Sequence, residues 1–387
     1  MLEWKLIRLG DICVTNKNSY SPKDNWKFVK YLDTGSLTEN KITELQYINI
    51  ETDKLPSRAR RKVRKNSILY STVRPNQLHY GIIKELVDNL LVSTGFTVID
   101  VDANKAIPEF IYYLLTQNNT TEQLQAIAEQ SVSTYPSIKS SDIEDLEFKL
   151  PNLIIQKKIV SILDTIDNKI RQNEKINNNL EQQAQAIYQH MFIDNSRSNW
   201  TDGTLSDIAD IIMGQSPSGS SYNENGNGTI FFQGRAEFGF RFPSAHLYTT
   251  EPKRMAHPND TLMSVRAPVG DLNVAYTDCC IGRGLAAIHS KTNHQSFVLY
   301  TMFSLKKQLD VFNGEGTIFG SINRNSLNDM PIFIPSDDIL DEFERIVAPM
   351  DLTIRNNYNE ICHLQDIRNS LLPRLMTGEI DVSAINL

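Results

Sequence analysis

Cysteine is scarce in this 387-residue sequence and follows none of the spacings that bind zinc or build a disulfide framework. Cys279 and Cys280 are adjacent, and Cys13 and Cys362 stand alone. A chain of this kind suits a reducing compartment, so we expect a cytoplasmic protein. No apolar run approaches the roughly 18 residues of a membrane span. The charged start "MLEWKLIRLGDI" has no apolar core, and we expect neither a secretory signal nor a membrane partner.

Catalytic motifs are missing too. There is no GxxxxGKS or GxxxxGKT phosphate loop and no HExxH zinc motif. No Asn/Asp-Pro-Pro-aromatic tetrapeptide is present, which argues against the active site of an amino-methyltransferase. The seven histidines show no ligand spacing. Two large segments without such motifs favour a binding protein, and we expect this chain to have no catalytic residue, no metal site and no bound cofactor.

Net positive charge is also absent, because the chain has a formal charge of -7. The balance is uneven: residues 1–193 carry 24 Lys and Arg against 23 Asp and Glu, whereas residues 194–387 carry 15 against 23. Nevertheless "PSRARRKVRK" (56–65) holds six basic residues in ten. Such a patch is typical of a surface that binds a phosphate backbone. The alternative is a solvated strand edge that lysine and arginine protect from aggregation.

The chain repeats itself at an offset of 184 residues. The segment "SIKSSDIEDLEFKLP" (137–151) aligns with "SINRNSLNDMPIFIP" (321–335) without a gap, and an alternating strand pattern recurs in both. Upstream, "NSILYSTVRP" (66–75) resembles "NDTLMSVRAP" (259–268), which places Arg74 and Arg266 at equivalent positions after a strand. Because the matches keep their order, we interpret the chain as a tandem duplication of a mixed α/β domain.

A long helix is predicted after the proline that ends each copy. Apolar residues and one asparagine step by seven along each helix, at Ile159, Ile166, Asn173, Leu180 and Ile187, and at Phe343, Met350, Asn357, Leu364 and Leu371. Sustained heptads indicate coiled-coil packing, and a lone polar seam residue fixes register at a cost in stability. Asn173 and Asn357 are therefore the predicted register residues, with Ile176 among the apolar companions on the first seam.

The position of the two asparagines favours an antiparallel pair of helices. Such a pair brings Asn173 within about one helical layer of Asn357, where the two amides can bond to each other. The predicted fold class is α+β: two mixed α/β domains in tandem repeat, each followed by a long helix, with the helices forming an antiparallel coiled-coil spacer. The alternative is two separate helices, each covering its own domain.

These features resemble the specificity subunit of type I restriction–modification systems. The resemblance is carried by "LPNLIIQKKIVSILDTIDNKI" (150–170), "IPSDDILDEFERIVAPMDLTI" (334–354) and the terminal "SLLPRLMTGEI" (370–380). The family pattern Leu/Ile-Asp-x-x-Ile falls on Asp167 and Asp351. The loop "GQSPSG" and the segment "SVRAPVG" are also similar to segments of its recognition domains. One departure is the end of the first helix, "IYQHMF" (187–192), which lacks the Gly-Glu-Ile tail.

The resemblance implies a non-catalytic subunit that reads a split double-stranded DNA target, one half-site per domain, with an unread gap set by the coiled coil. It implies an N-terminal target-recognition domain (1–150), a central helix (151–193), a C-terminal target-recognition domain (194–336) and a C-terminal helix (337–387). Modification subunits that bind S-adenosylmethionine and restriction subunits that use ATP and magnesium are the implied partners. The alternative function is a coiled-coil scaffold that bridges proteins without touching DNA.

Candidate DNA-binding residues fall into phosphate and base contacts. The dense basic run suits phosphates, and it consists of Arg58, Arg60, Arg61, Lys62, Arg64 and Lys65. Arg74 and Arg266 are candidates after equivalent strands, with buried ion pairs as the alternative, and Lys139 and Arg324 are candidates near the helix entries. In the second copy, Ser218, Ser221 and Tyr222 lie on a Gly/Ser/Asn-rich loop. Gln233 and Arg235 suit the reading of adenine and guanine.

Overall fold

A computed structural model describes residues 4–131, 136–196, 200–314 and 320–385. The chain forms two compact units: unit 1 comprises residues 1–171 and 361–387, and unit 2 comprises residues 172–360. Each unit therefore contains one mixed α/β domain together with parts of both long helices. The four-segment division predicted from the sequence, by contrast, assigns each helix to its own segment. No helix within the described ranges could span a membrane.

Unit 1 is built on two four-stranded sheets, with strand orders β2-β11-β8-β9 and β6-β3-β10-β7, and a β1-β12 pair. Its strands are β1 (Lys5–Arg8), β2 (Cys13–Thr15), β3 (Phe28–Leu32), β4 (Leu37–Thr38), β5 (Lys41–Ile42), β6 (Gln46–Asn49), β7 (Ala59–Lys62), β8 (Ile68–Ser71), β9 (Tyr80–Ile82), β10 (Leu90–Ser93), β11 (Phe96–Val101) and β12 (Glu147–Leu150). Its domain helices are α1 (Pro108–Leu115), α2 (Asn118–Ser131) and α3 (Ser140–Glu144). Strands β8, β10 and β11 are buried along their whole length, and the buried Asp100 of β11 is paired with Arg64.

Unit 2 repeats this plan with sheets ordered β14-β22-β19-β20 and β15-β17-β16-β21-β18, and a β13-β23 pair. Its strands are β13 (Thr201–Thr204), β14 (Ala209–Met213), β15 (Tyr222–Asn223), β16 (Thr229–Phe232), β17 (Tyr248–Thr249), β18 (Met255–Ala256), β19 (Thr261–Ser264), β20 (Leu272–Val274), β21 (Cys279–Ile281), β22 (Leu285–Ser290) and β23 (Pro331–Ile334). Its domain helices are α5 (Leu205–Ile208), α6 (Gln295–Ser304), α7 (Lys306–Leu309) and α8 (Arg324–Asn328).

The matching strand orders confirm the tandem duplication. In each copy one strand pair is parallel, β3 with β10 and β16 with β21, while the other ladders of these sheets are antiparallel. The structure corrects one detail of the predicted alignment. Val73 bridges Ser137, and Arg266 bridges Ser321, so Arg266 corresponds to Val73. Arg74 therefore lies one position further along than Arg266, and the two arginines are not equivalent.

The two long helices are α4 (Leu153–Tyr188), which continues as a π-helical turn Gln189–Asp194, and α9 (Asp337–Met376). The Asn152 side chain accepts from the Ile155 amide at the start of α4, and Asp337 and Asp338 favour the N-terminus of α9 through its dipole. Just beyond α9, Gly378 has a φ of +76°, a left-handed conformation that glycine tolerates best.

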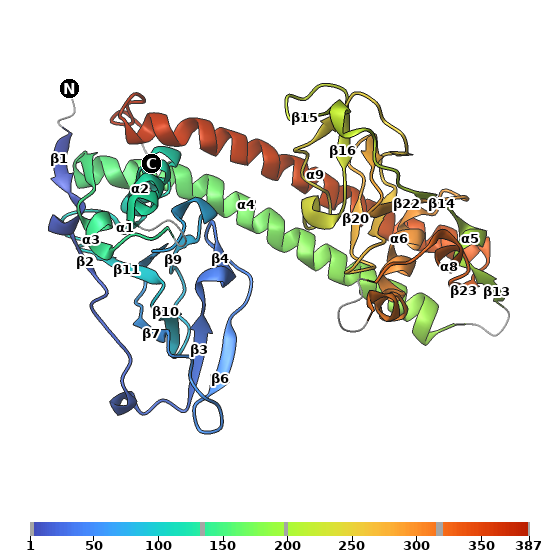
Figure 1. Ribbon diagram of the computed structural model, residues 1–387, viewed down its shortest axis with the longest axis horizontal. Helices are drawn as coiled ribbons and strands as arrows, with labels where there is room; N and C mark the ends of the chain where they lie inside the picture. Colours follow the sequence, from blue (N-terminus) through green and yellow to red (C-terminus); the bar gives the residue numbers. More distant parts are fainter. Residues whose placement is uncertain (1–3, 132–135, 197–199, 315–319, 386–387) are drawn as a thin grey trace. The chain divides into compact units, whose positions relative to one another are not determined.

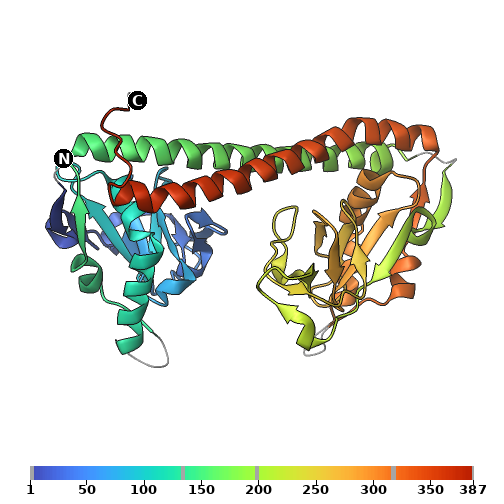
Figure 2. The ribbon, with the colours of Figure 1, turned by 90° about the horizontal axis from the view of Figure 1, so that it is seen from above.

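Within each unit, the helix segments pair antiparallel. In unit 1, Arg368 donates to Asp167 at 3.1 Å, and in unit 2, Asn173 donates to Glu360 at 2.7 Å. Within unit 2 the second contact, from Asn357 to Asn177, shows that residue numbers rise along α4 as they fall along α9. Figures 1 and 2 both show the helix segments of each unit side by side. Apolar residues of both helices, including Leu163 and Leu375 in unit 1 and Ala184 and Val347 in unit 2, join the cores of the domains.

The asparagines use different partners from the expected ones. Asn173 and Asn357 do not bond to each other: Asn173 bonds to Glu360, and Asn357 donates to Asn177 at 2.8 Å. Asn173 and Asn177 are both buried, whereas Ile176 is 46% exposed, so the prediction of Ile176 on the seam is wrong. Buried amides need partners, and the offset of one helical turn between the two asparagines supplies each with a separate one.

Each domain is tied to the helices by the same pair of residue types. In unit 1 the Tyr113 hydroxyl lies 2.7 Å from a carboxylate oxygen of Asp167 and 3.0 Å from one of Asp164, and its single proton is shared between them. In unit 2 the Tyr300 hydroxyl donates to Asp351 at 2.8 Å. Asp167 and Asp351 are separated by the repeat offset of 184 residues, and both tyrosines are buried. The aspartate of the Leu/Ile-Asp-x-x-Ile pattern is therefore the acceptor that holds the domain helix on the long helix.

The cation beside each aspartate comes from a different place. In unit 1 it is Arg368 on α9. In unit 2 it is Arg241, a 4% exposed residue of the domain, which bonds to Asp351 at 3.2 Å and Glu181 at 3.0 Å. A buried guanidinium needs such compensation because an unpaired buried charge is strongly destabilising. Nothing in the spacing of the sequence indicated this difference between the copies.

Replacing Tyr113 with phenylalanine tests the tie in unit 1. We expect a loss of about 1–3 kcal/mol in the free energy of unfolding, because hydrogen bonds to charged acceptors are lost. Denaturant unfolding monitored by circular dichroism measures it. Tyr112→Phe is the matched control, since the Tyr112 hydroxyl bonds to no described residue and its ring remains in place. Equal losses in the two variants would contradict the assigned role of Tyr113.

Candidate nucleic-acid interface

The strand ends of unit 2 enclose a hollow of about 410 Å³ that gathers three arginines. Arg266 follows β19, Arg283 lies between β21 and β22, and Arg235 follows β16. The lining also includes Gln233, Glu237 and Ser264. Three of the predicted site residues, Gln233, Arg235 and Arg266, are thus brought together from different parts of the sequence.

Backbone hydrogen bonds hold together two of the segments that line this hollow, the end of β16 and the β21–β22 connection. The Gly282 amide donates to Phe232 at 2.8 Å, and the Gly284 amide donates to Gln233 at 3.3 Å. A Cβ at position 284 would lie 2.8 Å from the Gln233 carbonyl oxygen, so the close approach requires glycine. The Arg283 amide also donates to the Ser216 hydroxyl at 3.3 Å. These contacts fix the Arg283 backbone, while its side chain remains exposed.

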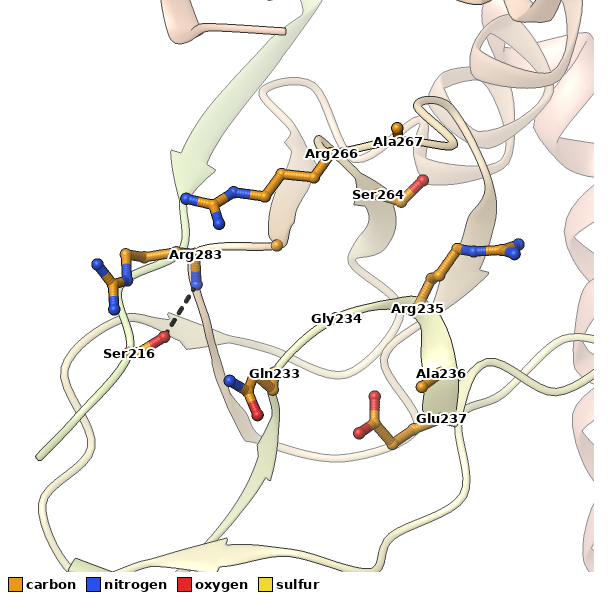
Figure 3. A pocket seen from close by; sticks show the side chains of 11 residues that line it. Ser216, Gln233, Gly234, Arg235, Ala236, Glu237, Ser264, Arg266, Ala267 and Arg283 are labelled. Carbon is orange, nitrogen blue, oxygen red and sulfur yellow. Dashed lines mark hydrogen bonds between the residues drawn. The ribbon is translucent and has the colours of Figure 1, made fainter. Parts of the chain in front are cut away.

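The three arginines differ in their availability. Figure 3 shows the Arg266 and Arg283 side chains on one side of the hollow and the Arg235 side chain directed away from them. Arg235 forms an ion pair with Asp271, which Lys306 also contacts at 3.2 Å. Both Arg266 and Arg283 are exposed. An exposed planar guanidinium can bond to two acceptors at once, as guanine O6 and N7 require.

The Gly/Ser/Asn-rich loop is ordered by its own side chains. The buried Ser221 hydroxyl bonds to Thr249 and to the Ser218 carbonyl, both at 2.7 Å. The Tyr222 hydroxyl donates to the Pro217 carbonyl at 3.2 Å. Ser221 and Tyr222 therefore shape the loop, whereas Ser218 is exposed and bonds to Ser220. Of these three candidates, only Ser218 is presented openly to a ligand.

The basic run of unit 1 divides in the same way. Lys62 pairs with Asp24 at 2.5 Å, and Arg64 pairs with Asp100 at 3.0 Å. Arg61 is half-buried, and burial lowers its pKa. Arg58, Arg60 and Lys65 are exposed. The run is thus partly structural, with β7 carrying Arg60, Arg61 and Lys62 in a sheet.

The remaining predicted cations lie at separate places. Arg74 is exposed with a φ of +47°, ahead of a 3-10 turn that begins at Pro75. Lys139 precedes α3, and Arg324 is the first residue of α8. Both are exposed. They occupy corresponding helix starts in the two units, as the repeat predicts, but neither lines the arginine hollow.

Sequence reasoning missed Arg283, Ser216 and Glu237. Arg283 stands within "GRG" (282–284), and the paired glycines were the available signal, since they permit the close strand contact. Glu237 could not be found this way, because its position depends on the turn after β16. Its Oε2 atom is buried and bonds to none of the described residues. Within the described ranges, no group of three or more His, Cys, Asp or Glu could hold a metal ion.

Comparison with known proteins connects this geometry to a family. The profile of the type I restriction modification DNA specificity domain matches residues 1–182. The chain is 30% identical to the putative type I restriction enzyme MjaX specificity subunit of Methanocaldococcus jannaschii, over 98% of this chain and 94% of that protein. It is 26% identical to the HindI specificity subunit of Haemophilus influenzae, over 98% of this chain and 100% of that protein.

Solved structures agree in coverage. The crystal structure of the HsdS subunit from Thermoanaerobacter tengcongensis is 29% identical, with a TM-score of 0.42 over 98% of this chain and 97% of that one. The type I S subunit from M. genitalium is 16% identical, with a TM-score of 0.59 over 97% of this chain and 96% of that one, which shows a shared fold. Because the match to the M. jannaschii relative covers nearly all of both sequences, this chain belongs to the family of type I restriction enzyme specificity subunits.

Proposed function

We propose that this chain is the non-catalytic, sequence-reading subunit of a type I restriction–modification assembly, and that unit 2 reads one half of a split DNA target at the arginine hollow. The observation that carries the proposal is the convergence of Gln233, Arg266 and Arg283 at one opening. Gln pairs with adenine and Arg with guanine in the major groove, so the opening has the chemistry of direct base reading.

The role of each residue follows from its contacts. Arg266 and Arg283 reach acceptor edges, since their exposed guanidiniums lie on the same side of the hollow. Gln233 is held at the end of β16, where its backbone carbonyl is already bonded to Gly284. Arg235 and Asp271 form a structural pair that supports the turn. Arg60 and Lys65 of unit 1 contact phosphates, which contribute affinity without sequence information.

Partners supply the chemistry in this proposal. Modification subunits bring S-adenosylmethionine and methylate the DNA, and restriction subunits bring ATP and magnesium. This chain contributes only the recognition of the DNA sequence. The proposal also explains how an acidic protein binds DNA: local arginines contact the grooves, while the rest of the clamp comes from other subunits.

The gap between the half-sites is assigned to the long helices. Helix α4 passes from unit 1 into unit 2, and α9 passes back, so each unit holds its own segment of the pair. A continuous helix has a fixed rise of about 1.5 Å per residue, which gives it the regularity that a spacer needs.

Arg283→Gln and Arg266→Gln test the reading role in unit 2. Each is expected to reduce discrimination at one position of one half-site by about 1–3 kcal/mol, because a bidentate contact is lost. Binding of the complex with its modification subunits to a library of DNA targets measures it. Arg235→Gln is the control and should leave both half-sites unchanged. A variant that alters both halves, or neither, would oppose the assignment of unit 2 to one half.

The double variant Arg60→Gln, Lys65→Gln tests the phosphate contacts. Binding should weaken at all sequences, and the salt dependence of the affinity should fall by up to about two units in slope, one per phosphate contact. Lys62→Gln removes a charge that is already paired with Asp24, so it should lower the melting temperature without changing the slope. If the salt dependence of the affinity is unaltered in the double variant, the basic run is a solvated strand edge and does not contact phosphates.

Matched insertions test the spacer. Seven residues, inserted between Arg171 and Gln172 and again between Glu360 and Ile361, preserve the heptad register of both helices. They add about 10 Å of rise, close to three base-pair steps of about 3.4 Å. The methylated motif in cells should then gain about three base pairs in its gap with both half-sites intact. Four residues inserted after Asn173 alone break the register and should abolish modification. A motif that keeps its original gap after the matched insertions would refute the spacer role.

A further inference from the structure

The reading site of unit 2 has a counterpart in unit 1 whose chemistry is different. Strand β3 pairs in parallel with β10, with Leu32 opposite Val92, and β16 pairs in parallel with β21, with Phe232 opposite Ile281. The residue that follows each first strand is therefore equivalent: Asp33 in unit 1 takes the place of Gln233 in unit 2.

Independent contacts support this equivalence. The Thr72 amide donates to the Gly95 carbonyl at 2.8 Å, as the Val265 amide does to Gly284 at 2.9 Å. Gly95 faces the Thr34 side chain, and Gly284 faces Gly234, so the loops meet at the same place. By this register Thr94 replaces Arg283. The bridge to Ser137 shows that Val73 replaces Arg266.

Asp33 is held in a defined orientation. The Tyr31 hydroxyl donates to its Oδ1 atom at 2.7 Å. Tyr31 is only 4% exposed, and burial raises the pKa of its hydroxyl, which keeps it protonated as a donor. Asp33 itself is half-buried at the end of β3. A carboxylate has several acceptor positions, so the bond from Tyr31 fixes Asp33 while leaving it able to accept from a ligand.

One cation of the basic run borders this place. The Thr94 amide donates to the Arg58 carbonyl at 2.9 Å. The Arg58 charge also opposes the rise in the pKa of Tyr31. Arg58 and Thr94 are both exposed. The counterpart site thus combines an oriented carboxylate with a hydroxyl and one arginine, whereas the site in unit 2 combines an amide with two exposed arginines.

We propose that Asp33 reads a base whose major-groove edge donates from an exocyclic amino group, namely cytosine N4, in the half-site that unit 1 recognises. The pairing follows from chemistry, because a carboxylate only accepts and cytosine presents the N4 amino donor. Adenine also presents an amino donor, at N6, but its neighbouring N7 is an acceptor that repels the second carboxylate oxygen. Thr94 and Arg58 contact the neighbouring base and phosphate. This inference rests on the proposed function, and it names a residue that determines the base preference in the half-site assigned to unit 1.

Asp33→Asn is the direct test. The amide keeps the size of the side chain and can still accept from Tyr31, but it adds a donor, which suits adenine. The assay measures binding of the complex with its modification subunits to a randomised split target, alongside the methylated motif in cells. The half assigned to unit 2 is identified as the one altered by Arg283→Gln. We expect one position in the other half to shift from cytosine toward adenine, with the affinity ratio changing by about tenfold or more.

Two further variants serve as controls for Asp33→Asn. Asp88→Asn makes the same charge change at an exposed residue that precedes the start of β10, away from Asp33 in the sequence. This variant should leave the recognised DNA motif unchanged. Tyr31→Phe keeps the carboxylate but removes its orienting bond, so discrimination at the same position should weaken. It remains informative if Asp33→Asn does not fold.

The outcomes separate the two proposals. A wild-type complex with no split motif refutes the proposed function, and the inference falls with it. A split motif that both Asp33→Asn and Tyr31→Phe leave unchanged refutes the role of Asp33 alone. A wild-type preference for adenine at the position affected by Asp33→Asn overturns the assignment to cytosine.

Discussion

The hydrogen bond from a buried domain tyrosine to an aspartate of a long helix is the constraint on which the other features of each unit depend. Tyr113 with Asp167, and Tyr300 with Asp351, join helices that the sheets alone would not fix. The strands carry the residues that we propose to read bases on short connections, so the position of those residues depends on how the domain sits on its helix. Both copies keep the tyrosine–aspartate hydrogen bond, whereas the arginine beside the aspartate comes from a different element in each copy. The hydrogen bond is therefore the shared part of the contact between domain and helix.

Arginine has two uses in this protein, and ion pairing with a carboxylate distinguishes them. Arg241, Arg64 and Arg235 are each paired to carboxylates and stabilise turns or helix contacts. Arg266 and Arg283 stand at strand ends with exposed guanidiniums. A formal charge of -7 is therefore compatible with DNA binding, since only the second group needs to meet the ligand.

The sequence predicted the repeat, the long helices and their antiparallel pairing, because these depend on periodicity, which is visible in a single chain. It also named Gln233 and Arg266 as candidates, the first for its amide and the second for its place after a strand, and the structure places both at the arginine hollow. It could not predict the partners of Asn173 and Asn357, because a shift of one turn between helices leaves the heptads unchanged. Arg283 and Asp33 were not among the sequence candidates for a related reason: a parallel strand pairing across long stretches of sequence sets their positions, and neither residue stands out by composition. Arg74 and Arg266 were aligned because both follow a valine in similar sequences. The β-bridges to Ser137 and Ser321 show instead that Arg266 corresponds to Val73.

Unit 1 closes on residues from both extremes of the chain. Leu375, Met376 and Val382 belong to the same buried cluster as Leu9 and Phe110, and a Cβ at Gly378 would meet the Trp4 ring at 2.9 Å. A lesion late in the gene, such as a premature stop after Glu360, would consequently strip the core of the domain encoded first, while the domain encoded second keeps its whole complement of residues. A truncation in the last part of the sequence would thus damage the domain that is translated first.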